Sequence, residues 1–258
     1  MTETWRLIPR YDGTGAEQMA IDSWLLDQHI KGLQPPCLRF YTWLVPTLSL
    51  GYHQRQFPDY WHTLQWQGQP IALVRRPTGG RAVLHQGDLT YALIMSVAKG
   101  SRREVYQQLC QFLIEGWQQL GIALSFGVAG RGYIHNPNCF GTATAADLVM
   151  ENGYKLIGSA QVYRQGCVLQ HGSMRLQPKA ELFEQVFGEK IEQSALLTVL
   201  RPLASLMGSG DEGLCYEAIT AALAEAASQC FEVEFEVRSL TPTEIKSAVA
   251  HHDMSGYR

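Results

Sequence analysis

The stretch RRPTGGRAVLHQGDLTY, which runs from Arg75 to Tyr91, decides how this chain is interpreted. Apolar residues precede it at 71–74, return within it at 82–84, and follow its second polar break at 89–97. This pattern predicts strand, tight turn, strand, turn, strand. Gly79 and Gly80 lack a Cβ, so the first turn can take positive φ and approach a ligand closely. The alternative is an ordinary hairpin turn with surface arginines, since Gly-Gly is common in hairpins.

The composition is that of a soluble globular protein. The 258 residues carry a formal net charge of −3, which argues against general nucleic-acid binding because that needs a basic surface. The N-terminus has no apolar signal core and no apolar run approaches the length of a membrane span, so we expect a cytoplasmic protein without a membrane segment. Six cysteines are spread along the chain without a CxxC pair, so we expect no metal site.

Apolar periodicity predicts more strands than helices. The clearest helix covers 101–120, where Ser101 and Glu104 form a capping box and Gly121 ends the helix. Further helices are expected at 16–30, 58–66, 179–187, 213–227 and 243–250, and strands at 5–8, 38–43, 47–52, 154–157, 167–176 and 231–237. Residues 127–138 and 158–160 are expected to be loops. The strands follow one another in hairpins more than in βαβ units, so the fold class is α+β with a largely antiparallel sheet.

Four side chains are candidates for chemistry. Cys139 lies in HNPNCFGTAT among polar and small residues, which suits a nucleophile, although a cysteine is more often a small core residue. Lys155 follows an Asn-Gly turn in GYKLIGSAQ; facing a pocket it would polarise a carbonyl and lower a thiol pKa, and otherwise it is solvated. His85 and His171 each lie at the expected end of a strand beside glycine. The alternatives for each are a general base, an orienting group and a hydrogen-bonded core histidine.

Four motifs taken together, RRPTGGRAVLH, CFG, YKLIGSAQ and LQHGSMRL, resemble the lipoate–protein ligase and octanoyltransferase family. That family shares its fold with the biotin–protein ligases, which implies a bent antiparallel sheet flanked by helices and an acyl chain in a tunnel. The resemblance implies that Lys155 lies near the acyl carbonyl and that residues 158–161 form a loop closing over it. It also implies a set of lining residues: Arg75, Arg76, Thr78, Gly79, Gly80, Arg81, Ala82, His85, Gly158, Ser159, Ala160, His171 and Gly172.

Within the family, Arg81 favours the transferases over the ATP-dependent ligases, which usually read Gly-Gly-Gly-Ala where this chain has Gly79-Gly80-Arg81-Ala82. Cys139 falls where the cysteine-dependent octanoyltransferases carry their nucleophile. Gly141 and residues 142–145 differ from the bulkier residues typical there, which bears on substrate preference. The chain after Leu176 also looks short for a full ligase accessory domain.

We therefore predict a cysteine-dependent octanoyltransferase with Cys139 and Lys155 as catalytic residues and no cofactor, since exchange between thioesters needs no ATP. The donor would be octanoyl-acyl carrier protein, and Lys99, Arg102 and Arg103 are candidate docking residues for that acidic partner. The acceptor would be a lipoyl-domain protein, such as the glycine cleavage H protein or a 2-oxoacid dehydrogenase E2. We expect a monomer with one catalytic domain over 1–258, its core at about 1–190 and a C-terminal extension at 191–258. The alternatives are an ATP-dependent lipoate–protein ligase, a lipoyl amidotransferase and a non-catalytic protein that binds an acyl group or a lipoyl domain.

Overall fold

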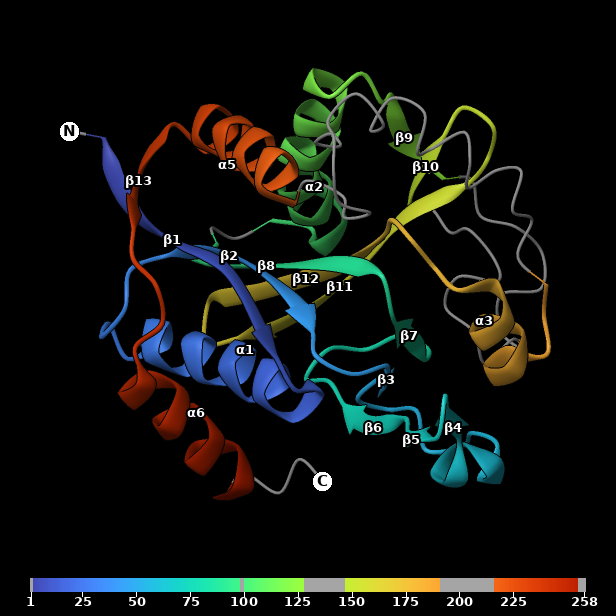
Figure 1. Ribbon diagram of the computed structural model, residues 1–258. Helices are drawn as coiled ribbons and strands as arrows, with labels where there is room; N and C mark the ends of the chain where they lie inside the picture. Colours follow the sequence, from blue (N-terminus) through green and yellow to red (C-terminus); the bar gives the residue numbers. More distant parts are fainter. Residues whose placement is uncertain (1, 98–99, 128–146, 191–215, 255–258) are drawn as a thin grey trace.

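A computed structural model describes residues 2–97, 100–127, 147–190 and 216–254 (Figure 1). Its main element is an eight-stranded sheet with the order β13-β1-β2-β8-β12-β11-β10-β9. The strands are β1 (Glu3–Gly13), β2 (Cys37–Trp43), β8 (Asp88–Ser96), β9 (Leu124–Phe126), β10 (Asp147–Met150), β11 (Lys155–Arg164), β12 (Cys167–Arg175) and β13 (Val233–Val237). Only β1 pairs in parallel, with β13 and β2, and the other neighbours are antiparallel, so the predicted fold class is confirmed.

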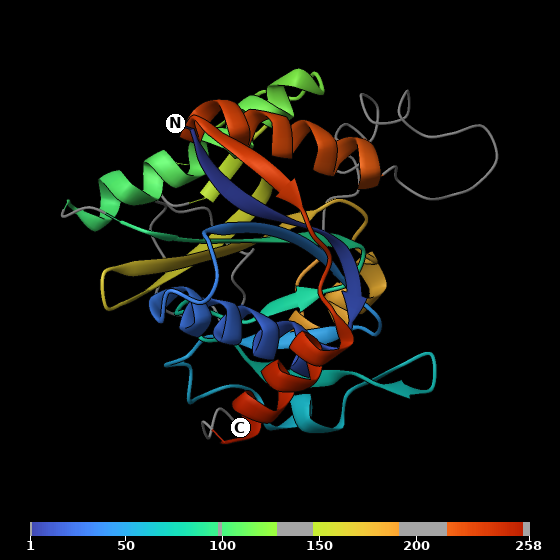
Figure 2. The same ribbon diagram turned by 90° about the vertical axis from the view of Figure 1, so that its left-hand side faces the viewer.

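Helices cover both faces of this sheet (Figures 1 and 2). Helices α2 (Arg102–Gln119) and α5 (Tyr216–Phe231) lie on one face, and α1 (Gly15–Ile30) and α6 (Pro242–Met254) on the other. The alternation in β2 explains the two layers, because successive strand residues point to opposite faces. Leu38 and Phe40 belong to the apolar cluster under α2, whereas Cys37 and Tyr41 belong to the cluster around α1.

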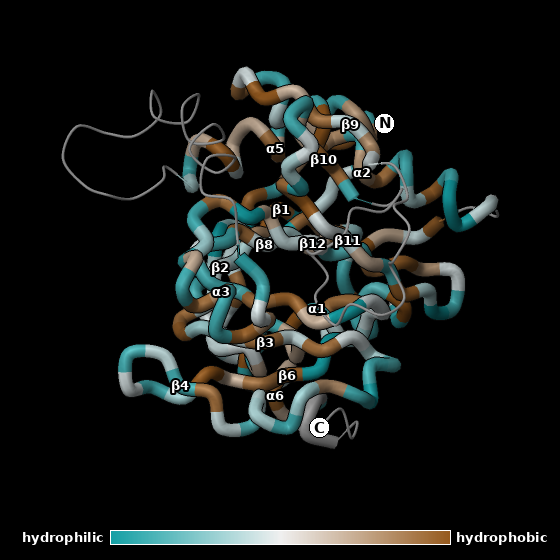
Figure 3. Tube along the Cα trace, turned by 90° about the vertical axis from the view of Figure 1, so that its right-hand side faces the viewer, coloured by the Kyte–Doolittle hydropathy of each residue, from teal (hydrophilic) through white to brown (hydrophobic). Residues whose placement is uncertain are grey.

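The C-terminal elements are part of this packing. Helix α5 contributes Ile219 and Leu223 to the cluster under α2, and β13 extends the sheet at β1. Figure 3 shows hydrophobic residues along the central strands and hydrophilic residues in the peripheral turns. No described helix is long and apolar enough to cross a membrane.

Local sequence signals set the ends of α2 as predicted, and a further signal sets the start of α1. Ser101 and Glu104 form the capping box of α2, and Gly121 follows the helix with a φ of +78°. Thr14 and Glu17 form a second capping box at the start of α1. Each box satisfies backbone N–H groups that the first turn of a helix leaves unpaired, so it fixes where the helix begins.

A smaller sheet lies below the main one in Figure 1, with the order β6-β3-β7. Its strands are β6 (Ala72–Arg75), β3 (Thr47–Leu50) and β7 (Val83–His85), and β3 pairs in parallel with β6 and antiparallel with β7. The three strands of the opening stretch are therefore present, but the hairpin alternative is wrong. The Gly-Gly segment joins two strands that are separated by β3, so it crosses the end of this sheet.

Two other expectations need correction. Residues 58–66 form a short 3-10 helix, η1 (Asp59–Thr63), followed by the two-stranded pair β4 (Gln65–Trp66) and β5 (Gln69–Pro70), rather than one helix. Residues 158–160 are not a loop but the middle of β11, where they pair with β12. The short helix α3 (Ala180–Phe187) forms as predicted and packs Leu182 and Val186 against the small sheet.

Candidate active site

A pocket lies between the α1 face of the large sheet and the small sheet, and it encloses about 650 Å³ of space when the solvent at its mouth is included. Its walls bring together residues far apart in the sequence: Met19, Tyr41, Trp43, Ser49, Arg76, Gly79, Gly80, Val83, His85, Thr90, Asp147, Lys155, Gly158, Ser159, Ala160, His171, Gly172 and Ser173.

Strand register explains why the polar groups of the large sheet face this pocket. His171 pairs with Ala160 across β12 and β11, and Ser173 pairs with Gly158 two residues on, so all four share one face. Tyr41 pairs with Thr90 across β2 and β8 on the same face. Ser159 points to the opposite face, where its Oγ lies 2.8 Å from the Tyr91 hydroxyl, so it lines the pocket through its backbone.

The Gly-Gly turn is held against the pocket by Arg76. This buried guanidinium donates to the backbone carbonyls of Ser49 at 2.8 Å, Gly79 at 2.8 Å and Arg81 at 2.7 Å. Gly80 has a φ of +94°, which favours glycine. The arginine therefore supports the turn that forms one wall.

Four other predicted lining residues lie beside the pocket rather than on its walls. Arg75 donates to the carbonyls of Gly51 and Gln54, at 2.8 Å each, and so holds the loop after β3. Ala82 packs in the apolar cluster of the small sheet, and Arg81 offers its carbonyl to Arg76. Thr78 is buried behind the pocket wall and bonds to His171. Their contact with substrate stays a prediction.

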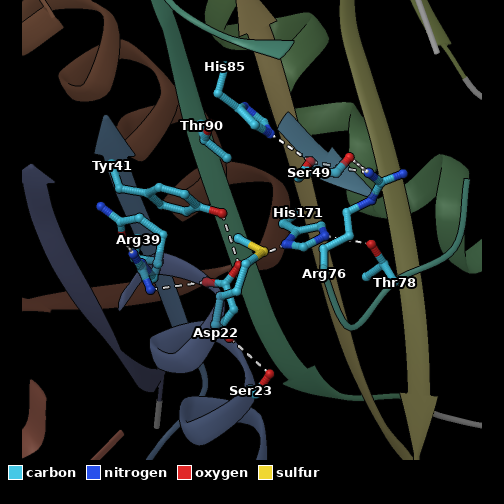
Figure 4. Close-up of polar contacts among 12 residues, drawn as sticks. Asp22, Ser23, Arg39, Tyr41, Ser49, Arg76, Thr78, His85, Thr90 and His171 are labelled. Carbon is cyan, nitrogen blue, oxygen red and sulfur yellow. Dashed lines mark hydrogen bonds and ion pairs between the residues drawn. The ribbon is translucent and has the colours of Figure 1, made fainter. Parts of the chain in front are cut away.

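His171 joins the Gly-Gly turn to helix α1. Its Nε2 lies 2.6 Å from Thr78 Oγ1, and its Nδ1 lies 2.7 Å from Asp22 Oδ2 (Figure 4). The Asp22 carboxylate also accepts a bond from the Tyr41 hydroxyl at 2.9 Å and pairs with Arg39 at 3.1 Å. Asp22 and Arg39 are both fully buried, so this charge pair is a fixed part of the core beneath the site.

His85 forms a second network on the other side of the pocket. Its Nδ1 lies 2.8 Å from Asp88 Oδ2 and its Nε2 lies 2.8 Å from Ser49 Oγ. The ring stacks on Trp43 with centroids 3.7 Å apart. Burial lowers the pKa of His85, although Asp88 opposes that shift by its charge and hydrogen bond.

Lys155 and Asp147 form the third polar group. Lys155 Nζ lies 2.9 Å from Asp147 Oδ1, and each side chain is 5 % exposed. Gly158 lies against this lysine, because a Cβ on it would be 3.2 Å from Lys155 Cε. A larger residue at 158 would therefore crowd the ammonium group.

Cys139 lies outside the described residues, as do Lys99, Cys215 and residues 142–145. Asp147 comes eight residues after Cys139 in the sequence and lies in the pocket wall. The described Cys37, Cys110 and Cys167 are buried and Cys230 is half-buried, and all four are free thiols. No group of three or more metal-ligating side chains occurs among the residues that the structure describes.

Several residues of the pocket and of the hydrogen-bond networks behind it were missed from the sequence. Asp22 and Asp88 each stand in otherwise apolar stretches, AIDSWLL and GDLTYALI, and such an isolated acid is the one signal that marks a buried polar contact. Tyr41 and Trp43 are two residues apart in a predicted strand, which gives the face they share but not the pocket. Ser49 and Asp147 carry no local signal.

The model of the lipoyl protein ligase A/B catalytic domain matches residues 14–228 of this sequence. The chain belongs to this family. It is 34 % identical to octanoyltransferase LipM of Kyrpidia tusciae over 95 % of its own length and 94 % of that protein. It is 33 % identical to octanoyltransferase LipM of Halalkalibacterium halodurans, and this match covers 94 % of the present chain and 92 % of the relative. The predicted family and enzyme class are thereby confirmed.

Solved structures agree on the fold. Protein Ta0514 of T. acidophilum, solved with bound lipoic acid, superposes with a TM-score of 0.73 at 22 % identity and covers 98 % of this chain and 96 % of its own. A lipoate–protein ligase A bound with ATP gives a TM-score of 0.71 at 21 % identity, with 97 % and 94 % covered. At these identities the two structures show the likeness of the fold alone.

Proposed function

We propose that this octanoyltransferase moves an octanoyl group from an acyl carrier protein to a lysine of a lipoyl domain through a thioester on Cys139. The observation that supports this most is the buried Lys155–Asp147 pair in the pocket wall, in which Asp147 follows Cys139 by eight residues in the sequence. Because Lys155 lines the pocket, its ammonium group is available to the carbonyl of an acyl group bound there. The relatives named octanoyltransferase, matched over more than nine-tenths of both chains, support the same acyl group.

In the first step the Cys139 thiolate attacks the carbonyl carbon of the octanoyl thioester, and the carrier leaves as its thiol. One thioester replaces another, so the step needs no nucleotide. The Lys155 ammonium stabilises the negative charge that develops on the carbonyl oxygen and favours the thiolate. Backbone N–H groups near Gly79 and Gly80 or near Gly158 are candidates to share that charge.

In the second step the acceptor lysine attacks the octanoyl-Cys139 thioester and the cysteine thiol is released. The product is an amide, which is more stable than the thioester, so the transfer is favourable without a cofactor. The apolar side chains of Met19 and Val83 line the same pocket and suit the alkyl chain. The reaction takes place in the cytoplasm, where the chain's free thiols stay reduced.

Intact-mass spectrometry after mixing with octanoyl-acyl carrier protein tests this function. The wild type should gain one octanoyl group, and Cys139→Ala should gain none. Cys230→Ala is the matched control, because it removes a half-buried thiol outside the pocket, and it should load normally. Lys155→Gln should load much more slowly than the wild type because it lacks the charge near the carbonyl.

Octanoylation of Cys139→Ala, or a normal transfer rate in that variant, would overturn the proposal. Pyrophosphate release from lipoate, ATP and magnesium would point to the ligase alternative. Loading from an octanoylated lipoyl domain in place of the carrier would point to the amidotransferase. Tight octanoate binding without any covalent adduct would point to a non-catalytic acyl-binding protein.

Partner docking forms a further part of this proposal. Arg102 and Arg103 begin α2 and are exposed, and Arg102 lies over the Tyr163 ring at 5.2 Å from its centroid. We keep both as candidate contacts for the acidic carrier, to be tested by charge reversal and the salt dependence of loading.

A further inference from the structure

The two histidines of the pocket are each held between a carboxylate and a hydroxyl group, but the two networks differ in their access to the pocket. Thr78, the hydroxyl partner of His171, is fully buried and lies behind the wall. Ser49, the hydroxyl partner of His85, lines the pocket itself. Both histidines line the pocket, but only the His85 network also presents its hydroxyl group there, whereas the hydroxyl group of the His171 network belongs to the Gly-Gly turn.

We propose that Ser49, His85 and Asp88 form a proton relay that accepts the proton of the attacking lysine in the second half-reaction. The inference rests on the proposed function, because it assigns the base for aminolysis of the acyl-enzyme. Ser49 is the contact with the incoming amine, His85 accepts the proton, and Asp88 is a positioning residue that acts through His85.

The hydrogen bonds around Asp88 fix the tautomer of His85. Asp88 Oδ2 accepts bonds from Ser173 Oγ at 2.6 Å and Thr90 Oγ1 at 3.3 Å, and it lies 2.8 Å from His85 Nδ1. Thr90 Oγ1 in turn accepts a bond from Trp43 Nε1 at 2.9 Å, so its own proton is directed to Asp88. A carboxylate surrounded by donors requires a proton on Nδ1, which leaves Nε2 as an acceptor.

The bonding of Ser49 then leaves one position open. A hydroxyl has one proton and two lone pairs. The proton of Ser49 Oγ is donated to His85 Nε2 at 2.8 Å, and one lone pair accepts from Arg76 Nη1 at 3.2 Å. Within the described part of the chain no other group bonds to Ser49 Oγ, so its second lone pair can accept an N–H from a bound amine.

The charges around His85 suit uptake of a proton during the reaction. Asp88 from β8 stabilises the imidazolium form, whereas Arg76 beside β6 and His171 from β12 oppose it. Burial lowers the pKa of His85, so the ring is a neutral base before the amine attacks. Arg76 also favours loss of the Ser49 proton toward His85.

The step balances without any further reactant. The amine nitrogen bonds to the thioester carbonyl carbon and transfers its proton to Ser49 Oγ as the Ser49 proton moves to His85 Nε2. The bond between the carbonyl carbon and the cysteine sulfur then breaks. The His85 imidazolium then gives its proton back to Ser49 Oγ as the Ser49 proton passes to the departing thiolate, which leaves an amide and a thiol.

The test measures the two half-reactions separately. The enzyme is first loaded with octanoyl-acyl carrier protein and freed of the carrier, and excess unmodified lipoyl domain is then added at a series of pH values. Intact mass reports the loss of the acyl group from the enzyme and its gain by the lipoyl domain. His85→Gln and Asp88→Asn should slow this transfer by about 10²–10⁴-fold at neutral pH, the range of general-base catalysis.

The pH profile separates a base from a structural support. The loss of transfer rate in both variants should become smaller as pH rises, because the acceptor lysine then loses its proton to solvent. Both variants should slow the transfer step far more than the loading step. Asp88→Asn should act through the wrong tautomer of His85, so the double variant should be no slower than the slower single variant. Ser49→Ala should slow transfer, and Ser49→Thr, which keeps a hydroxyl, should be faster than Ser49→Ala.

The matched control is His29→Gln. His29 Nε2 lies 3.0 Å from Ser96 Oγ and its Nδ1 lies 3.0 Å from the Gln34 carbonyl, so it is a histidine–serine pair outside the pocket. It should transfer at the wild-type rate. Normal transfer by loaded His85→Gln and Asp88→Asn, or a loss that is equal at every pH, would overturn the relay. A wild type that never forms an acyl-enzyme would instead overturn the proposed function.

Discussion

Replacing Asp22 by alanine should lower the free energy of unfolding by about 3–5 kcal/mol, the cost of leaving a buried charge without its partner. Asp22 and Arg39 are both 0 % exposed, and their side chains are 3.1 Å apart. The substitution leaves the Arg39 guanidinium in the core with Gln18 as its remaining side-chain hydrogen-bond partner among the described residues. It also removes the acceptor of the Tyr41 hydroxyl and of His171 Nδ1.

Thermal and urea unfolding measure this effect. For a chain of this length a loss of that size lowers the melting temperature by about 6–20 °C. The double variant Asp22→Ala/Arg39→Met should recover part of the loss, because an apolar replacement of a buried pair is often nearly neutral. The matched control is Asp12→Ala, which breaks a surface pair with Arg10 in which Asp12 is 49 % exposed and should cost less than about 1 kcal/mol.

Two results would refute this reasoning. One is an Asp22→Ala protein with stability within about 1 kcal/mol of the wild type, the level expected of a surface pair. The other is a double variant that is less stable than Asp22→Ala, which would mean that Arg39 stabilises the core without Asp22.

Two further predictions concern stability. Burial alone would raise the pKa of Glu244, but hydrogen bonds from Arg6 and Thr241 and the Arg6 charge lower it to about 2. A carboxyl group whose pKa is lowered by folding stabilises the protein above its usual pKa of 4.5, and this stability is lost as pH falls toward 2. The free energy of unfolding in urea should therefore fall more steeply between these pH values in the wild type than in Glu244→Gln. Parallel curves for the two proteins would contradict this. Gly172→Ala should destabilise the protein by about 1–3 kcal/mol, because its Cβ would lie 2.3 Å from Ser159 Oγ and 2.9 Å from the Gly158 carbonyl oxygen. Gly79→Ala, where a Cβ meets nothing within 4 Å, is the control, and equal stability of the two variants would contradict the packing argument.

The sequence by itself determined the local elements and the family. The alternation of residues 38–43 predicted the strand β2, and the capping box at Ser101 predicted where α2 begins. These features depend on residues that are only a few positions apart in the sequence, so their pattern is visible along the chain. The same holds for Lys155 and the Gly-Gly turn, whose neighbours in sequence carry the family motifs.

Only the tertiary structure decided which segments meet. Gly79-Gly80 looked like a hairpin turn, but β3 comes between β6 and β7, and the pairing of strands distant in sequence leaves no local trace. Residues 158–160 looked like a loop because they are small; in β11 that smallness makes room for Lys155 beside Gly158.

The polar networks follow the same rule. Asp22, Ser49 and Asp88 carry no motif, and their roles come from contacts across 149, 36 and 85 residues of chain with His171, His85 and Ser173. A buried acid needs donors around it, but the sequence does not say which elements supply them. The packing of the two sheets and α1 around one pocket determines which elements supply these donors.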